Sequence, residues 1–255
     1  MRRRDTAGRV VLVTGASRGI GRATAELLAD RGAVVVATGR VEPALAAVTA
    51  RTGGSYLAAD LTEPAAPEAL VEHAVAAHGR LDGLVVNAGA GHVGPFGQMT
   101  AGQVAGLVDL DLRAPLLLAR AAIPALRTSP GRQRGIVFVG SIAGAVGVPE
   151  ESAYSACKSA LGTFAELLAE ELRADGIRVS TVLPGVVDTE FLAGRAVPYD
   201  RRFPRPVPPE RVARVIADAL DGGPARRFVP RWLVVPARLA GAVPGSYRRL
   251  ARRFG

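Results

Sequence analysis

The stretch RVVLVTGASRGIG, residues 9–21, decides the fold of this chain. An apolar run ends at Thr14 and is followed at once by a glycine-rich turn that opens a helical pattern. Gly15 suits a tight turn, Gly19 lets the backbone approach a pyrophosphate, and Gly21 allows close packing of helix on strand. Backbone N–H groups and the positive end of the helix would then face the phosphates. The turn therefore predicts a dinucleotide site; the alternative is a similar turn without a ligand.

The rest of the chain continues this alternation of short apolar runs and longer helical patterns. The apolar residues run continuously, which is typical of parallel strands covered on both faces. We expect strands at 9–14, 33–38, 55–60, 83–89, 135–141, 178–185 and 226–230, and helices at 19–31, 41–52, 64–79, 100–127, 152–174 and 209–221. Right-handed crossovers then predict an α/β fold: a doubly wound, parallel, seven-stranded sheet in a single Rossmann-type domain, residues 1–230, without a separate substrate domain.

Composition agrees with one soluble, cytoplasmic domain. The chain has 255 residues, of which 49% are hydrophobic and 22% charged, as in ordinary globular proteins. Cys157 is the only cysteine, so no internal disulfide can form and a reducing compartment suits the chain. The apolar run 10–13 is too short for a signal peptide, and no stretch approaches the roughly 18 apolar residues of a membrane span. His73, His78 and His92 lack metal-ligand spacing, so we expect no metal.

The net charge of +9 is concentrated near the end of the chain. No acidic residue follows Asp221, and the eight arginines after it give +8, so the first 221 residues carry only +9 − 8 = +1. This distribution speaks against a nucleic-acid partner. Residues 231–255 form a basic C-terminal extension that mixes arginine with apolar and aromatic side chains. It could lie on an anionic membrane surface as a peripheral contact, dock an acidic protein, or pack on the substrate pocket with its arginines in solvent.

Residues 194–209, GRAVPYDRRFPRPVPP, have no helical or strand periodicity. Long segments of this kind in compact domains are often lids, so we expect residues 190–210 to cover the substrate. Their apolar side chains favour an apolar molecule, and their arginines would tolerate an anionic end: Phe191, Leu192, Tyr199 and Phe203 on the one hand, and Arg195, Arg201, Arg202 and Arg205 on the other.

The stretch SAYSACKSAL, residues 152–161, contains Lys158, the one lysine among 32 basic residues. On a helix, Tyr154 and Lys158 lie one turn apart on the same face. A free phenol has a pKa near ~10, and an adjacent ammonium favours the phenolate, which brings the phenol closer to acid–base catalysis at neutral pH. Ser141 ends a predicted strand and could hydrogen-bond a substrate carbonyl oxygen. The alternatives are a surface lysine beside a packed tyrosine, and a serine that only caps the strand end.

The second predicted strand ends in ATGR, so that Gly39 and Arg40 stand where an acidic residue would bind the ribose 2′-hydroxyl of NAD. Arg18, inside the glycine-rich turn, adds a second cation near the same ribose. Two guanidinium groups can bind a 2′-phosphate through charge-assisted hydrogen bonds. The sequence therefore favours NADP(H); the alternative is that both arginines are only solvated.

At this point the chain resembles the classical short-chain dehydrogenases/reductases over roughly residues 8–230. The resemblance is carried by several motifs in order and at family spacing: TGASRGIG at 14–21, Asp60-Leu61, NAG at 87–89, Ser141, Tyr154-x-x-x-Lys158, and Pro184-Gly185 followed by Thr189. Any one of them alone would be unspecific. The family implies a homodimer or homotetramer built on the two long helices, at 100–127 and 152–174.

The resemblance also implies a role for each motif residue. Tyr154 would be the acid or base acting on the carbonyl or carbinol oxygen, Lys158 would lower its pKa and bind the nicotinamide ribose, and Ser141 would orient the substrate oxygen. Asp60 would contact the adenine and Thr189 the nicotinamide carboxamide. The full expected cofactor set is Gly15, Ser17, Arg18, Gly19, Ile20, Gly21, Arg40, Asp60, Leu61, Asn87, Ala88, Gly89, Tyr154, Lys158, Pro184, Gly185, Val187 and Thr189.

One residue departs from the family pattern. The chain reads LVDLDLR at 107–113, with Asp111 where the family usually has an Asn that keeps a water linking the lysine to solvent. Asp111 could accept a hydrogen bond from that water or pair with Lys158 and hold it charged, but it lacks the amide donor. We therefore include Asp111 among the catalytic candidates.

The leading hypothesis is an NADP-dependent reductase or dehydrogenase acting on a small carbonyl compound or secondary alcohol. A second is a nucleotide-binding sensor or scaffold that has lost catalysis, motivated by Asp111; it predicts NADPH binding without turnover, restored by Asp111→Asn. A third, an epimerase or dehydratase of the extended branch, is disfavoured by the short chain, the spacing of the glycine turn and the lack of a sizeable substrate domain.

Overall fold

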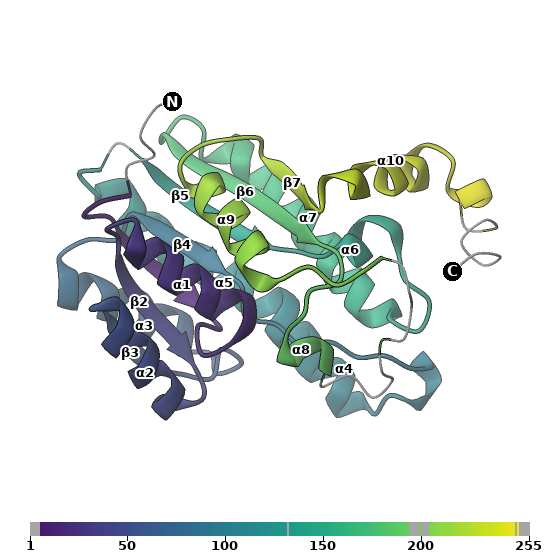
Figure 1. Ribbon diagram of the computed structural model, residues 1–255, viewed down its shortest axis with the longest axis horizontal. Helices are drawn as coiled ribbons and strands as arrows, with labels where there is room; N and C mark the ends of the chain where they lie inside the picture. The colour runs from purple at the N-terminus through teal and green to yellow at the C-terminus, as the bar shows by residue number, and fades with distance from the viewer. Residues whose placement is uncertain (1–5, 132, 194–198, 200–203, 248, 250–255) are drawn as a thin grey trace.

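The computed structural model describes residues 6–131, 133–193, 199, 204–247 and 249. One sheet of seven parallel strands forms its centre, in the order β3-β2-β1-β4-β5-β6-β7 (Figure 1). The strands are β1 (Val10–Thr14), β2 (Val34–Gly39), β3 (Ser55–Ala58), β4 (Gly83–Val86), β5 (Arg134–Val139), β6 (Ile177–Pro184) and β7 (Arg226–Val229). The predicted doubly wound, seven-stranded parallel sheet is therefore confirmed.

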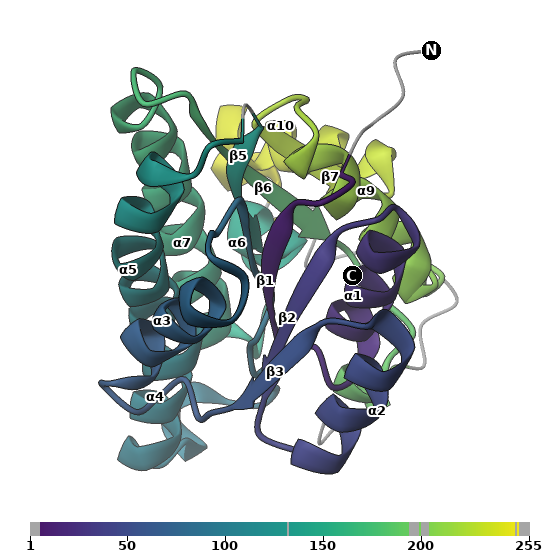
Figure 2. The same ribbon diagram turned by 90° about the vertical axis from the view of Figure 1, so that its left-hand side faces the viewer.

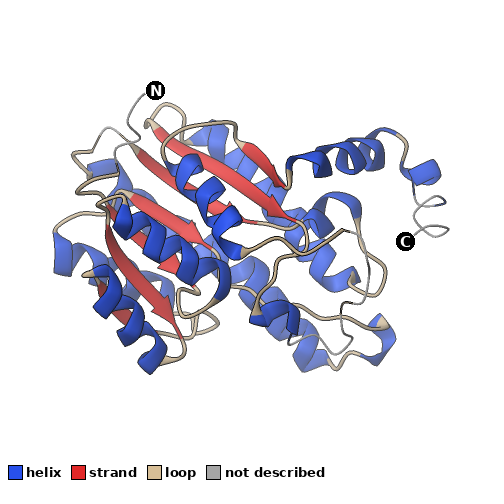
Figure 3. Cartoon of the chain, viewed as in Figure 1, coloured by secondary structure: helices blue, strands red, loops and turns tan. Residues whose placement is uncertain are grey.

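Helices cover both faces of this sheet (Figures 2 and 3). On one face lie α3 (Ala66–His78), α5 (Ala114–Thr128) and α7 (Ser152–Glu171); on the other lie α1 (Gly19–Asp30), α2 (Glu42–Thr52) and α9 (Pro209–Leu220). All five residues of β1 are buried. Val10 and Leu12 join the core under α3, α5 and α7, while Val11 and Val13 join the core under α1, α2 and α9. Successive strand residues point to opposite faces, which explains the continuous apolar run.

The predicted helix over 100–127 is divided into three parts. It begins as α4 (Ala101–Val108), passes through a π-helical turn, Asp109–Arg113, and continues as α5. A π-helical turn takes in one more residue than an α-helical turn, and such turns are frequent at functional sites. Its middle residue, Asp111, is fully buried. The prediction of one uninterrupted helix over residues 100–127 is therefore wrong.

Several short elements were not predicted from the sequence. They are the 3-10 turns Phe96–Gln98 and Arg231–Leu233, and the helices α6 (Ile142–Val146), α8 (Glu190–Ala193) and α10 (Val234–Ala242). The helix α8 begins the predicted covering segment 190–210, most of whose arginines, with Phe203, lie outside the described residues. In the part of the chain that is described, no helix is long and apolar enough to span a membrane.

The strand order places the site. From β1 the chain proceeds to β2 and β3 on one side, and then crosses back to β4 on the other. At such a reversal the loops after the two neighbouring strands diverge and leave a crevice outside their carboxyl ends. The loops that follow β1, β4, β5 and β6 all meet at this edge, and they carry most of the predicted site residues.

Candidate active site

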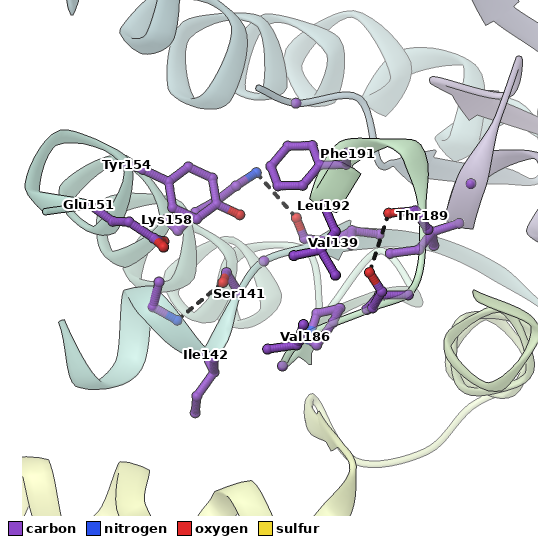
Figure 4. Close-up of a pocket in the computed structure, with 18 of the residues that line it drawn as sticks. Val139, Ser141, Ile142, Glu151, Tyr154, Lys158, Val186, Thr189, Phe191 and Leu192 are labelled. Carbon is purple, nitrogen blue, oxygen red and sulfur yellow. Dashed lines mark hydrogen bonds between the residues drawn. The ribbon is translucent and has the colours of Figure 1, made fainter. Parts of the chain in front are cut away.

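A cavity of about 480 Å³ lies at this crevice and brings distant motifs together (Figure 4). Fifteen of the predicted residues line it: Gly15, Arg18, Gly19, Ile20, Asn87, Ala88, Gly89, Asp111, Ser141, Tyr154, Lys158, Pro184, Gly185, Val187 and Thr189. The predicted residues Ser17, Gly21, Arg40, Asp60 and Leu61 do not line it. Ser17 and Gly21 lie within the glycine-rich turn or just behind it, and the other three follow β2 and β3.

The glycine-rich turn has the geometry that its sequence requires. Gly15 and Gly19 have φ of 65° and 54°, in the left-handed region that favours glycine. A Cβ atom on Gly21 would lie 2.1 Å from the carbonyl oxygen of Gly15, so no larger residue fits there. The first turn of α1 contains no acidic residue, and no side chain caps its N-terminus. Its free N–H groups and positive end therefore face the cavity as an anion site.

Asn87 holds the loop after β4 against the end of β1. Its Nδ2 donates to the Thr14 carbonyl oxygen at 2.9 Å, and its backbone N–H donates to Thr14 Oγ1, also at 2.9 Å. The Ala88 N–H donates to the same hydroxyl at 3.0 Å. Thr14 was not predicted as a site residue; a hydroxyl at the end of the first strand was the only signal for it. Thr14 and Asn87 together hold the loop after β4 in a fixed position relative to the end of β1.

Ser141 and Tyr154 come from neighbouring elements on one wall of the cavity. Ser141 precedes α6 and its Oγ accepts from the Ala143 N–H at 3.1 Å, so it caps the start of a helix, which the sequence did not predict. It also lines the cavity, with Tyr154 on the first turn of α7. Figure 4 shows Ser141, Tyr154 and Lys158 around one space. A capping bond uses one acceptor site of the hydroxyl and leaves its proton free to be donated.

Lys158 is buried beneath this wall. Its Nζ lies 2.8 Å from Asp111 Oδ1, 3.5 Å from the carbonyl oxygen of Val139 and 5.7 Å from the centre of the Tyr154 ring. Asp111 Oδ2 accepts from the Ala90 N–H at 3.1 Å, which ties the pair to the loop after β4. The lysine is thus neither on the surface nor free, because it is buried and paired with Asp111.

The charges around Tyr154 act in opposite directions. Burial raises the pKa of Tyr154, Lys158 lowers it, Asp111 raises it and the Ser141 hydroxyl lowers it, with a raised pKa as the net result. Burial alone would lower the pKa of Lys158, but Asp111 and then Tyr154 outweigh burial and raise it. The expectation that the pKa of Tyr154 falls is therefore wrong. Lys158 acts in the predicted direction, but burial and Asp111 exceed its effect.

At the end of the crevice next to β2, Arg18 precedes α1 and the exposed Arg40 follows β2, both at the carboxyl edge of the sheet. Asp60 Oδ1 accepts from the backbone N–H of Thr62 at 2.9 Å and from its hydroxyl at 2.8 Å. These two bonds, ahead of the nearby Arg40 charge, lower the pKa of Asp60. The sequence places no carboxylate directly after β2, so the positive charge of Arg40 is available to a ligand.

The opposite wall contains residues that the sequence indicated only as part of a covering segment. Phe191, on α8, has its ring centre 6.3 Å from that of Tyr154. A Cβ atom on Gly91 would lie 2.8 Å from Phe191 Cζ, so the ring packs directly on that glycine. Val93, Val148, Leu192 and Tyr199 complete a mostly apolar lining. Among the described residues, no group of three His, Cys, Asp or Glu side chains is arranged to hold a metal ion.

The fold and this site define a class: an open α/β domain with a glycine-rich phosphate turn and a Ser–Tyr–Lys group beside it. The model of the short chain dehydrogenase family matches residues 9–197. The chain belongs to the short-chain dehydrogenase/reductase family, whose members are oxidoreductases that use a nicotinamide cofactor. The resemblance inferred from the motifs is thereby confirmed.

Among curated relatives, the chain is 36% identical over 197 residues to 3-oxoacyl-(acyl-carrier-protein) reductase FabG of Escherichia coli strain K12, covering 76% of this chain and 79% of that protein. It is 38% identical over 224 residues to cis-4-hydroxycyclohexanecarboxylate dehydrogenase of Sinomonas cyclohexanicum, covering 83% and 88%.

Solved structures of the same family are also similar. A metagenomic short-chain oxidoreductase in complex with NADP has a TM-score of 0.73 at 35% identity, covering 88% of this chain and 97% of that one. A Burkholderia phymatum short-chain dehydrogenase/reductase in complex with NAD has a TM-score of 0.83 at 24% identity, covering 93% and 94%. At that identity the second similarity concerns the fold alone.

Proposed function

We propose that this protein is an NADP-dependent oxidoreductase that interconverts a carbonyl compound and a secondary alcohol, with Tyr154 as the acid and base. One observation carries the proposal: Ser141, Tyr154 and Lys158 line the same cavity as the glycine-rich turn. The reacting oxygen would lie between the Ser141 and Tyr154 hydroxyl groups, where both can donate to it. When bound, the nicotinamide supplies or accepts the hydride.

The side chains of the cavity would supply the proton transfer and the charge stabilisation. In the reduction direction, Tyr154 gives its proton to the oxygen as charge develops there; in the oxidation direction, it takes the carbinol proton. Lys158 would stabilise the phenolate and, when the cofactor is bound, would hold a ribose hydroxyl. The raised pKa of Tyr154 keeps the phenol protonated at neutral pH, and this state suits reduction.

NADP(H) is proposed over NAD because of the charges at the adenosine end. Arg18 and Arg40 supply two guanidinium groups, and the position directly after β2 holds Arg40 and not an acidic residue that would repel a 2′-phosphate. The turn fits a diphosphate, because its glycines let the backbone pack where a Cβ atom would collide, and the N-terminus of α1 has no side-chain cap and no acidic residue in its first turn. The similar oxidoreductase that was solved with NADP is in keeping with this choice.

The substrate is proposed to be a small, largely apolar carbonyl compound or alcohol. Phe191, Leu192, Val93 and Val148 line the cavity beyond Tyr154, and apolar walls favour apolar ligands. Two similar relatives are named for a 3-oxoacyl-(acyl-carrier-protein) and for cis-4-hydroxycyclohexanecarboxylate, so ketones with chains or rings are the first to test. We also propose a cytoplasmic homodimer or homotetramer, with residues 1–230 as the catalytic domain and 190–210 over the substrate.

The experiment replaces the phenol alone. Tyr154→Phe removes one hydroxyl, and general acid–base catalysis is worth typically ~10²–10⁴ in rate. We expect NADPH consumption, measured across ketones of graded size, to fall by about that factor, while NADPH affinity measured by fluorescence stays close to that of the wild type. An unchanged rate would remove Tyr154 from the mechanism. Binding of NADPH without turnover in the wild type would instead support the sensor hypothesis.

A further inference from the structure

The C-terminal helix α10 has two different faces. Leu233, just before it, packs against Gly185, where a Cβ atom would lie 2.8 Å from Leu233 Cδ1. Further along, Ala240, Pro244 and Tyr247 line a hollow shared with α6 and α7. Leu233 and Ala240 are seven residues apart, which is two helical turns, and Pro244 and Tyr247 follow after the end of α10 at spacings of four and three. This side is therefore fastened to the domain beside the candidate active site.

The other side of α10 exposes a stripe of large apolar residues. Trp232, Val235, Leu239 and Val243 are 41%, 56%, 47% and 47% exposed. Their spacing of three, four and four residues places them along one line of the helix. They make up four of the ten exposed large hydrophobic residues in the described chain. We call these four residues the α10 stripe. Single exposed apolar residues are ordinary, but an aligned row of them marks an interaction surface.

Positive charge runs beside the α10 stripe. Arg231 and Arg238 are both exposed and seven residues apart, so they lie along one edge of the stripe. Arg249 is exposed further on. In the described part of the chain, no carboxylate pairs with any of these three arginines. The whole chain after Asp221 carries eight arginines and no acidic residue. A surface that covers the α10 stripe must therefore accept positive charge.

We propose that the α10 stripe docks the protein on an anionic lipid surface. An amphipathic helix with apolar side chains on one face and arginines at its edge lies in the plane of a membrane interface, with the apolar face among the acyl chains. Tryptophan favours this depth, and Arg231 and Arg238 reach phosphate groups at the edge. Figure 1 shows α10 at the periphery of the molecule, beyond α6, where a flat surface can approach it.

Charge also decides against a second copy of the chain as the occupant. Two α10 stripes facing one another would bring two sets of unpaired arginines together, and like charges disfavour such a contact. An acidic protein could also pair with the arginines. A straight row of apolar residues on a short peripheral helix, however, matches a flat lipid surface better than the curved surface of a protein. Docking there would also bring the cavity, which Gly185 lines beside Leu233, close to the source of an apolar substrate.

The test uses Trp232, the one tryptophan of the chain. The full-length protein is mixed with vesicles of phosphatidylglycerol and phosphatidylcholine, and with vesicles of phosphatidylcholine alone. We expect the Trp232 emission to shift to shorter wavelength, and the protein to sediment, only with the anionic vesicles. Val235→Glu/Leu239→Glu should weaken this binding by about tenfold or more, because two charges enter the apolar stripe. Arg231→Gln/Arg238→Gln should weaken it and reduce its salt sensitivity.

The matched control is Val75→Glu on α3, a valine 38% exposed on a different surface, which should bind vesicles like the wild type. Circular dichroism and NADPH affinity establish that each variant is folded. If Val235→Glu/Leu239→Glu does not fold, Val235→Gln/Leu239→Gln is used in its place. Equal binding to neutral vesicles would overturn the proposal. The proposal would also be overturned if no vesicle binding occurred and the native mass fell only in the α10 variants, because that result would indicate a second copy of the chain. Binding to an acidic carrier protein but not to vesicles would overturn it as well.

Discussion

Lys158 Nζ and Asp111 Oδ1 are 2.8 Å apart, and the side chains of both residues are almost completely buried. A buried ion pair is costly to break, because removing one partner leaves an unpaired charge away from water. The pair keeps Lys158 charged, and Asp111 raises the pKa of Tyr154 in opposition to Lys158. The aspartate thus sets the charge balance of the group that we propose as the catalytic centre.

Asp111→Asn should shift the pH dependence of alcohol oxidation to lower pH. The substitution removes a negative charge that raises the pKa of Tyr154, so the phenolate needed as base forms at lower pH. The measurement is kcat/KM for alcohol oxidation against pH. The control is Asp109→Asn on the same turn, whose pair with Arg113 is partly exposed and should leave the profile unchanged. A shift to higher pH would contradict the assigned effect of Asp111.

Gly89→Ala should impair the site although it adds only one methyl group. A Cβ atom at position 89 would lie 2.7 Å from Asp111 Oδ1 and 3.3 Å from Lys158 Nζ. Overpacking a buried site typically costs about 1–3 kcal/mol, and here it would also separate the ion pair. We expect a lower free energy of unfolding and a lower kcat. Gly106→Ala on α4 meets no atom within 4 Å and should change neither; a Gly89→Ala enzyme with normal kcat would argue against the importance of the pair.

Arg40→Gln should weaken binding of NADPH far more than binding of NADH. Arg40 is exposed after β2, and a charge-assisted bond to a phosphate is worth roughly 1.5–3 kcal/mol. We expect about a tenfold or greater loss of NADPH affinity, measured by fluorescence titration, with NADH affinity unchanged. Arg22→Gln is the control, because Arg22 pairs with Glu26 on the outer side of α1. Equal losses for both cofactors would contradict the proposed contact with the 2′-phosphate.

Asp82 should be essential for stability, far from the cavity. It is fully buried, its Oδ2 accepts from the Val10 N–H at 2.9 Å, and it also contacts Arg80 and the Ser129 hydroxyl. Asp82→Ala leaves Arg80 and Ser129 without this partner, and such losses cost about 3–5 kcal/mol. We expect this decrease in the free energy of unfolding by urea. Asp30→Ala, which removes a surface pair with Arg51, should cost at most about 1 kcal/mol.

The pKa of Asp82 also predicts how stability depends on pH. Burial raises the pKa of Asp82, but the hydrogen bonds from Arg80, Ser129 and Val10 together lower it by more, so that the pKa is lowered overall. A carboxyl with a lowered native pKa contributes its full stability above its unfolded pKa of about 3.9 and loses it as the pH falls through the native pKa. The wild type should therefore lose stability below about pH 4, and Asp82→Asn should lose less over the same interval.

The sequence by itself determined the parts of this protein that depend on local pattern. Continuous apolar runs predicted the buried strands, the glycine-rich turn predicted the cradle at the start of α1, and the spacing of Tyr154 and Lys158 predicted their common face. Each of these follows from the regular geometry of helices and strands. The motifs together were also specific enough to identify the family.

Only the tertiary structure decided what depends on contacts between distant segments. The sequence left open whether Asp111 pairs with Lys158, because the π-helical turn that turns its carboxylate inward has no distinct local pattern. It gave the wrong direction for the pKa of Tyr154, since burial and a charge 43 residues away in the chain exceed the effect of the nearby lysine. The α10 stripe likewise became visible only when α6 and α7 covered the opposite side of the helix. Burial and long-range charge arise from packing, which a linear pattern does not contain.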